Sequence, residues 1–120
     1  KPESKFWNEV RRNLPTISFT RLESWASAGV PDLLCHLENK GFFTIELKVT
    51  ASKKITFSPH QIAFFVKHPK NSFVLVAGSP DPQLVRLYPG SRILELVASG
   101  LKLEPLACGL AACVGWFESL

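Results

Sequence analysis

Cysteine is scarce in this sequence, and the cysteines present are poorly placed for the usual cysteine-based sites. Cys35, Cys108 and Cys113 cannot all pair within one chain, and no two of them have the Cys-x-x-Cys spacing of a zinc site. A disulfide-rich scaffold and a structural zinc domain are therefore poor descriptions of this chain. The pattern favours a reduced, intracellular protein.

Long apolar runs and low-complexity segments are also missing. The most apolar stretch, residues 105–117, is too short to span a bilayer, and the N-terminal KPESKFWNEVRRN lacks the apolar core of a signal peptide. With 46% apolar and 20% charged residues, the composition is that of an ordinary globular domain. We expect residues 1–120 to form a single domain with no membrane partner.

Acidic residues are too few to balance the basic ones, and the imbalance is uneven along the chain. The 14 Lys and Arg residues exceed the 10 Asp and Glu residues, which gives a net charge of +4. Residues 1–70 hold 11 basic and 6 acidic side chains, whereas residues 71–120 hold 3 and 4. A polyanionic partner is therefore expected to meet the first part of the chain.

Hydrophobic periodicity predicts helices that alternate with strands. Trp7, Val10 and Leu14 recur at helical spacing, and Asn39-Lys40-Gly41 is typical of a hairpin turn. The expected elements, in chain order, are a helix at 2–14, a strand at 17–21, a loop at 24–30, hairpin strands at 32–38 and 42–49, a helix at 58–67, strands at 73–77 and 83–88, and a helix at 91–99. The order α-β-β-β-α-β with a tail predicts an α/β fold, a mixed sheet flanked by helices, with its core at about 3–77 and a C-terminal extension at about 78–120.

Two carboxylates and a lysine fall together on the expected hairpin. Side chains alternate between the faces of a strand, so Glu46 and Lys48 share one face, and antiparallel pairing can bring Asp32 beside Glu46. Convergent carboxylates suit a hard cation such as Mg²⁺ or Mn²⁺, and a neighbouring lysine can orient or deprotonate a water, as phosphodiester hydrolysis requires. The competing interpretation is a surface ion pair between Glu46 and Lys48, with an aspartate that only begins a strand.

These residues carry a resemblance to a known nuclease superfamily. Gly29-Val30-Pro31-Asp32-Leu33-Leu34, followed by Thr44-Ile45-Glu46-Leu47-Lys48, resembles the PD-(D/E)XK signature. Glu3-Ser4-Lys5-Phe6-Trp7, Arg21-Leu22-Glu23 and Ser58-Pro59-His60-Gln61 resemble the small virus-type replication-repair (VRR-NUC) and phage Holliday-junction-resolvase-like members. The resemblance covers about residues 3–77. It implies a restriction-endonuclease-like core, with Mg²⁺ or Mn²⁺ held by Asp32, Glu46 and the backbone carbonyl of Leu47, and with Lys48 acting on the attacking water.

The superfamily often supplies a further carboxylate from its first helix, and Glu3 and Glu9 compete for that role. At 100° per residue, Glu3 falls within the stripe of Trp7, Val10 and Leu14, whereas Glu9 lies about 120° away. A carboxylate in an apolar stripe is costly unless a metal or its water pairs with it, so Glu3 is the preferred candidate ligand. The alternative is that Glu3 remains in water in the first helical turn.

Gln61 has two interpretations, which are not exclusive. It resembles the glutamine that this group carries after the E-x-K strand, where it touches the water or the lysine. It also fits a capping box, with Ser58 as the N-cap and Gln61 reaching back to it.

Several basic side chains are candidates for phosphate contacts. They are Lys53, Lys54, Arg21, Arg11 and Arg12. The two lysines rank first because the loop 50–57 directly follows the E-x-K strand, and the alternative for all five is solvated surface charge. His36 and His60 could approach the site but are expected to be ordinary surface or packed histidines.

The apolar segment 105–117 is rich in small residues and is either a helix packed on the sheet or a subunit interface. A homodimer is a reasonable hypothesis, because the resembling enzymes that act on branched DNA need two active sites across a two-fold axis.

Together with this resemblance, the sequence predicts a Mg²⁺-dependent endonuclease that hydrolyses DNA, double-stranded or branched, in the cytoplasm of a bacterial or phage-infected cell. Holliday junctions in recombination or repair are the branched substrate that the resemblance implies. One alternative is a DNA-binding module without catalysis, against which the intact Asp32, Glu46 and Lys48 argue. Another is a small restriction-type endonuclease, for which 120 residues leave little room to read bases.

Overall fold

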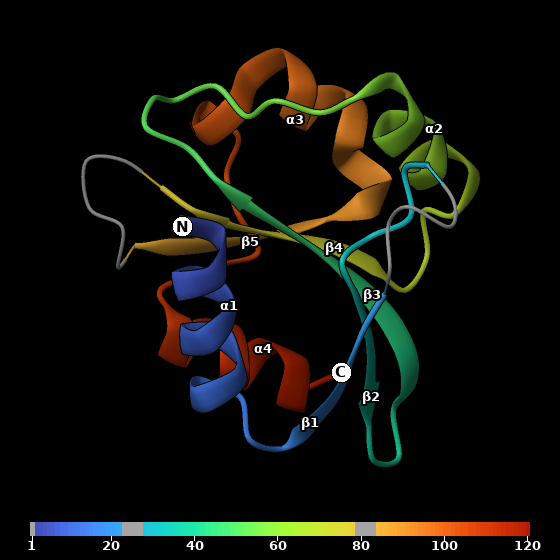
Figure 1. Ribbon diagram of the computed structural model, residues 1–120, viewed down its shortest axis with the longest axis vertical. Helices are drawn as coiled ribbons and strands as arrows, with labels where there is room; N and C mark the ends of the chain where they lie inside the picture. Colours follow the sequence, from blue (N-terminus) through green and yellow to red (C-terminus); the bar gives the residue numbers. More distant parts are fainter. Residues whose placement is uncertain (1, 23–27, 79–83) are drawn as a thin grey trace.

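The residues that the structure describes form one six-stranded sheet with helices on both faces (Figure 1). The computed structural model describes residues 2–22, 28–78 and 84–120, without the side chains of Pro2 and Glu3. The elements are α1 (Pro2–Asn13), β1 (Ile17–Arg21), β2 (Leu33–Leu37), β3 (Gly41–Val49), α2 (Pro59–Lys67), β4 (Ser72–Ala77), β5 (Val85–Pro89), the 3-10 turn η2 (Gly90–Arg92), α3 (Ile93–Ser99), the 3-10 turn η3 (Gly100–Lys102), β6 (Ala107–Cys108) and α4 (Leu110–Glu118).

The strands follow one another across the sheet in sequence order. All neighbouring strands are antiparallel except β3 and β4, which are parallel and are joined by the crossover helix α2. The expected α/β class, a mixed sheet flanked by helices, is confirmed. The expected loop at 24–30 and the start of the strand expected at 83–88 lie partly outside the described residues.

Each face of the sheet carries its own apolar core. On one face, α1 and α4 cover odd-numbered residues of β3, which are Phe43, Ile45 and Leu47. On the other face, α2 and α3 enclose a second core that includes Phe65, Val74 and Tyr88. All six residues of β4 are buried, as expected for a strand with helices above and below.

Residues 84–120 complete the same sheet and both helical layers. Strands β5 and β6 extend the sheet beyond β4, and α3 joins α2 on one face. The apolar C-terminal segment forms a helix packed on the sheet, which begins at Leu110 and buries Cys113 and Phe117. The phenyl ring of Phe117 stacks on that of Phe43, with ring centroids 5.0 Å apart.

Candidate active site

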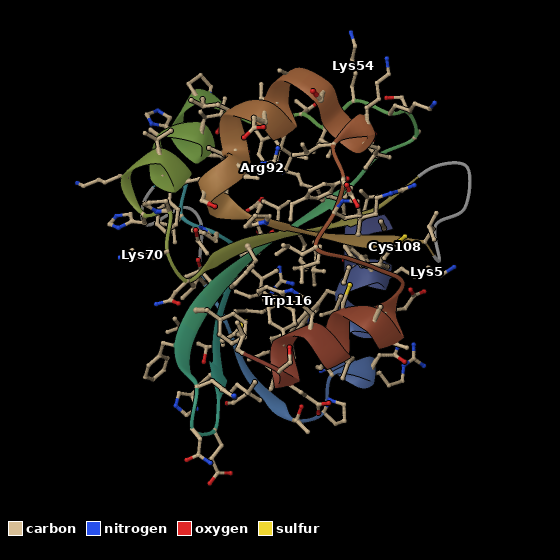
Figure 2. All side chains as sticks on the ribbon, turned by 180° about the vertical axis from the view of Figure 1, so that it is seen from behind. Lys5, Lys54, Lys70, Arg92, Cys108 and Trp116 are labelled. Atoms are coloured by element: carbon tan, nitrogen blue, oxygen red, sulfur yellow. The ribbon has the colours of Figure 1, made fainter. Side chains whose placement is uncertain are left out.

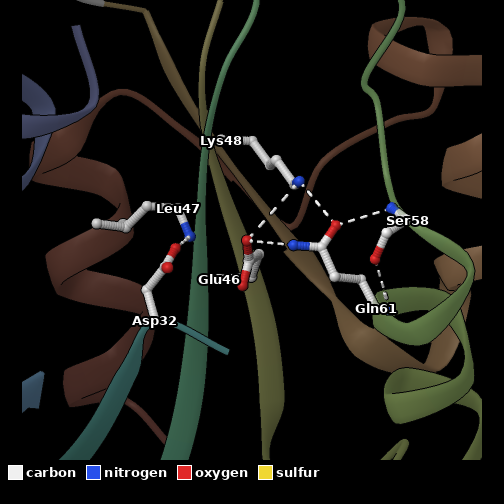
Figure 3. A network of polar contacts seen from close by, with 6 residues as sticks. All are labelled: Asp32, Glu46, Leu47, Lys48, Ser58 and Gln61. Atoms are coloured by element: carbon white, nitrogen blue, oxygen red, sulfur yellow. Dashed lines mark hydrogen bonds and ion pairs between the residues drawn. The ribbon is translucent and has the colours of Figure 1, made fainter. Parts of the chain in front are cut away.

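Asp32 lies at the entrance to β2, where its carboxylate reaches the neighbouring strand. Its Oδ2 accepts a hydrogen bond of 2.9 Å from the backbone N–H of Leu47 in β3 (Figure 3). The last β2–β3 pair is Leu33 with Ile45, so one further step of the register sets Asp32 opposite Glu46. The backbone carbonyl of Asp32 accepts from the N–H of Leu22, which continues the pairing with β1. The hairpin therefore sets Asp32 across from Glu46, with its carboxylate bound to the backbone of the next residue, Leu47.

Glu46 is one of two buried polar or charged residues among those the structure describes, with 4% of its surface exposed. It extends from β3 on the side of α2, the face opposite to Ile45 and Leu47. Its Oε2 accepts a 3.0 Å hydrogen bond from Gln61 Nε2 and lies 3.7 Å from Lys48 Nζ. A buried carboxylate is costly unless it is paired and hydrogen-bonded, and both compensations are present here.

Lys48 shares the face of Glu46, two residues further along β3. Its Nζ donates a 2.9 Å hydrogen bond to Gln61 Oε1, and it lies 4.8 Å from the centre of the Phe57 ring. The side chain is 18% exposed, so its ammonium group is partly shielded from water yet accessible. Three groups therefore fix the position of the ammonium: a carboxylate, an amide oxygen and an aromatic face.

Gln61 connects the helix α2 to the charged pair on β3. Its amide oxygen accepts from Lys48 and its amide nitrogen donates to Glu46, so one side chain bridges a cation and an anion (Figure 3). The same oxygen accepts from the backbone N–H of Ser58 at 2.9 Å, while Ser58 Oγ accepts from the N–H of Gln61. Both interpretations of Gln61 hold together: it closes the capping box, and it contacts the lysine.

The oxygen atoms near Asp32 fit a hard divalent cation. The N–H and C=O of one strand residue point to the same side of the strand. Since the N–H of Leu47 faces Asp32, the carbonyl of Leu47 is directed to that side as well. The donors of Asp32, Glu46 and Leu47 are all oxygens, which suit Mg²⁺ or Mn²⁺ rather than zinc. Among the described residues, no group of three or more His, Cys, Asp or Glu side chains could hold a metal, so a cation here would depend on the backbone carbonyl.

The proposed contribution of Glu3 lies outside the described residues. Glu3 belongs to the first turn of α1, and nothing further is described of its side chain. Its competitor Glu9 lies later in the same helix and is half-buried. The apolar stripe of α1 is Phe6, Val10 and Leu14, all buried, with Trp7 beside it.

The candidate phosphate contacts fall into two groups. Lys53 and Lys54 are exposed on the loop that leaves β3. Arg11 and Arg21 both lie over the ring of Trp7, with their Cζ atoms 5.8 and 5.4 Å from its centroid. Arg12 is exposed on α1, which covers the other face of the sheet from α2. The fold therefore brings the lysines to one layer and the arginines to the other.

The histidines and the buried cysteines have simpler roles, and one aromatic contact of the site was not predicted. His36 packs its ring against Phe42, with centroids 4.6 Å apart, and His60 is exposed on the first turn of α2. Burial raises the pKa of the Cys35 thiol to about 12 and that of Cys113 to about 11, so neither supplies a thiolate nucleophile. The contact of Phe57 with Lys48 was not predicted from the sequence.

Comparison with known proteins gives matches in structure only. No protein-family model matches the chain, and no curated protein does. Among solved structures, Hjc, a Holliday junction resolvase from the archaeal hyperthermophile Archaeoglobus fulgidus, is similar with a TM-score of 0.57 and 14% identity, covering 76% of this chain and 75% of that one. A VRR_NUC domain is similar with a TM-score of 0.51 and 20% identity, covering 82% of this chain and 96% of that one. In the described part of this chain, the helices are too short or too polar to cross a membrane.

Proposed function

From the premise that the chain has a PD-(D/E)XK-type nuclease fold, like that resolvase and that VRR_NUC domain, we propose that it is a metal-dependent endonuclease that hydrolyses DNA phosphodiester bonds. The observation that carries the proposal is the network in which Gln61 joins Glu46 to Lys48 on β3, where the intervening residue, Leu47, donates its backbone N–H to the Asp32 carboxylate. A surface ion pair needs neither the burial of Glu46 nor a third side chain that binds both charges.

In this proposal each residue has a separate task. Asp32, Glu46 and the Leu47 carbonyl, with Glu3 as a further candidate, would hold a Mg²⁺ ion. Such an ion, when bound, polarises the phosphoryl oxygen and increases the acidity of a water. Lys48, as an ammonium, orients the attacking water and stabilises the negative charge that develops on the phosphate. Gln61 and the Phe57 ring keep the Lys48 ammonium in place.

We further propose a branched substrate, such as a Holliday junction, and a role in recombination or repair. The structural likeness to a Holliday junction resolvase supports this choice. Cleavage of both strands at a junction calls for two active sites, so a homodimer is part of the proposal. The three cysteines are all free, which supports the reducing cytoplasm of a bacterial or phage-infected cell as the place of action.

The test of the chemistry compares Glu46→Ala and Glu46→Gln with Glu38→Ala, which changes an exposed glutamate in the hairpin turn. We expect cleavage with Mg²⁺ or Mn²⁺ that falls roughly 100-fold or more in both Glu46 variants and is unchanged in the control. Gln at position 46 keeps an acceptor for Gln61, and circular dichroism establishes that each variant is folded. Cleavage in the presence of a chelator, or full activity of Glu46→Gln, would exclude this mechanism.

The same assay distinguishes the possible substrates. A panel of four-way junction, flap, single strand and linear duplex is incubated with Mg²⁺, with Glu46→Ala in parallel. Preference for the junction supports resolvase-like activity, and cleavage of linear duplex at discrete sequences favours a restriction-type enzyme. Binding without cleavage of any substrate identifies a DNA-binding module on a nuclease scaffold.

A further inference from the structure

A cleft of about 850 Å³ separates the loop after β3 from the end of α3. Residues 52–56 form one wall, and residues 97–100 together with Lys102 form the other. The two walls are far apart in the sequence, so no local pattern relates Lys102 to the lysines of the loop. Figure 2 shows Lys54 extending outward beside α3.

The charge of this cleft is of one sign. Lys53 and Lys54 on one wall and Lys102 on the other are exposed, and none of the described residues lining the cleft is acidic. Positive side chains on both walls of a cleft focus its potential and attract an anionic ligand. The distribution suits an extended anion that lies along the cleft and contacts both walls, rather than a single ion.

The loop is held in place before any ligand arrives. The carbonyl of Lys53 accepts a 2.8 Å hydrogen bond from the N–H of Leu101, which ties the two walls together. Gly100 has a φ of +58°, and a side chain there would collide with the Lys53 carbonyl, so the close approach requires glycine. Within the loop, Thr50 Oγ1 donates to the carbonyl of Lys54 or Ser52, at 2.5 and 3.1 Å. Binding therefore costs little ordering of the backbone.

Both ends of the loop touch the candidate active site. Lys48 precedes it on β3, and Phe57 at its other end lies against the Lys48 ammonium. Lys54 is six positions after Lys48, and an extended chain covers about 3.5 Å per residue, so the two lie within roughly 20 Å. At about 3.4 Å of rise per nucleotide, that distance is at most about six nucleotides of duplex DNA.

We propose that this cleft binds the phosphodiester backbone of the DNA strand to one side of the cleavage site, with Lys102 completing the contacts of Lys53 and Lys54. The identity of the ligand as DNA rests on the proposed function. It adds a residue from the part of the chain that the PD-(D/E)XK resemblance does not cover. It also defines the path of the DNA strand over the protein, from Lys48 along the loop toward η3.

The test measures DNA binding by fluorescence anisotropy of a labelled linear duplex, in chelator, over a series of salt concentrations. The variants are Lys102→Ala, Lys53→Ala with Lys54→Ala, and the triple variant. The control is Lys70→Ala, an exposed lysine at another side of the molecule (Figure 2). Each lost phosphate contact should reduce the slope of log affinity against log salt by about 0.9. We expect Lys102→Ala to lower the slope by about one unit and to weaken binding roughly 3- to 10-fold at low salt, while Lys70→Ala leaves both unchanged.

The outcomes separate this inference from the proposed function. If Lys102→Ala has the same affinity and salt slope as Lys70→Ala while the wild type still cleaves DNA, the cleft is not a strand-binding site and the nuclease proposal stands. If the wild type cleaves nothing but the three lysines still set the salt slope, the cleft proposal stands and the nuclease proposal fails. Lys102→Glu should weaken binding more than Lys102→Ala, and equal binding by the two would overturn the phosphate contact.

Discussion

At the scale of single residues, the site owes its organisation to a few side chains that each make several contacts. Asp32, Glu46 and Lys48 could be predicted because they depend on strand alternation and hairpin pairing, which are local. The capping box could be predicted and places the Gln61 side chain at the start of α2. Its bridge between Glu46 and Lys48 depends on how α2 packs on β3. The contact of Phe57 with Lys48 depends on how the loop returns to the sheet, and no spacing in the sequence encodes that path.

The dual role of Gln61 gives a prediction in which stability and activity separate. Gln61→Ala removes the acceptor of Lys48 and the donor to Glu46, so we expect cleavage to fall roughly 10- to 100-fold. Ser58→Ala removes only the N-cap, at a cost of about 1 kcal/mol in the free energy of unfolding, and should retain cleavage. Urea denaturation and a cleavage assay on both variants provide the comparison. Equal activities in the two would show that the amide of Gln61 acts on the helix alone.

At the scale of elements, the turn before Asp32 is fitted closely to the first turn of α2. Gly29 has a φ of +82°, and a Cβ there would overlap the backbone carbonyl of His60. The turn that carries Asp32 and the helix that carries Gln61 are therefore in contact, although 31 positions separate Gly29 from His60. The periodicity of the sequence predicted both elements but contained no sign that they touch.

This contact predicts different effects for two glycine substitutions. Gly41 also has a positive φ, +93°, but nothing lies within 4 Å of its added Cβ. Gly41→Ala should therefore cost only backbone strain, about 1 kcal/mol, whereas Gly29→Ala adds a collision and should cost about 2 kcal/mol or more. We expect Gly29→Ala, and not Gly41→Ala, to reduce cleavage because it shifts the turn that precedes Asp32 relative to the helix that carries Gln61. Chemical denaturation and the cleavage assay measure both effects, and matching losses in the two variants would contradict the packing argument.

At the scale of the whole molecule, the two faces of the sheet have different tasks. The face covered by α1 and α4 is an apolar core, while the face covered by α2 and α3 holds the Glu46 network above a smaller core. The sequence predicted the mixed sheet over about residues 3–77, where alternation and turns are clear. Beyond residue 84 it predicted β5 and α3 but not β6, since a two-residue strand is set by its partner, not by periodicity.

The proposed homodimer is a prediction at this scale. One chain has a mass of 13.3 kDa and one candidate site, so cleavage of two strands at a junction calls for two copies. We expect light scattering to give about twice the chain mass at working concentration. The dimer should dissociate only when the protein is diluted well below that concentration. A monomeric mass across the concentration series would remove the dimer from the proposal and leave the single-strand chemistry intact.

The crossover between β3 and β4 also sets the order in which the site comes together during folding. The β2–β3 hairpin is a local structure that can form early, and it alone sets Asp32 opposite Glu46. Gln61 arrives only when α2 returns the chain to the parallel strand β4, a slower, long-range closure. We therefore expect a refolding chain to bring Asp32 and Glu46 together before Gln61 reaches Lys48. We expect recovery of cleavage after dilution from denaturant to lag behind recovery of the β2–β3 hairpin, because cleavage also needs Gln61 in place.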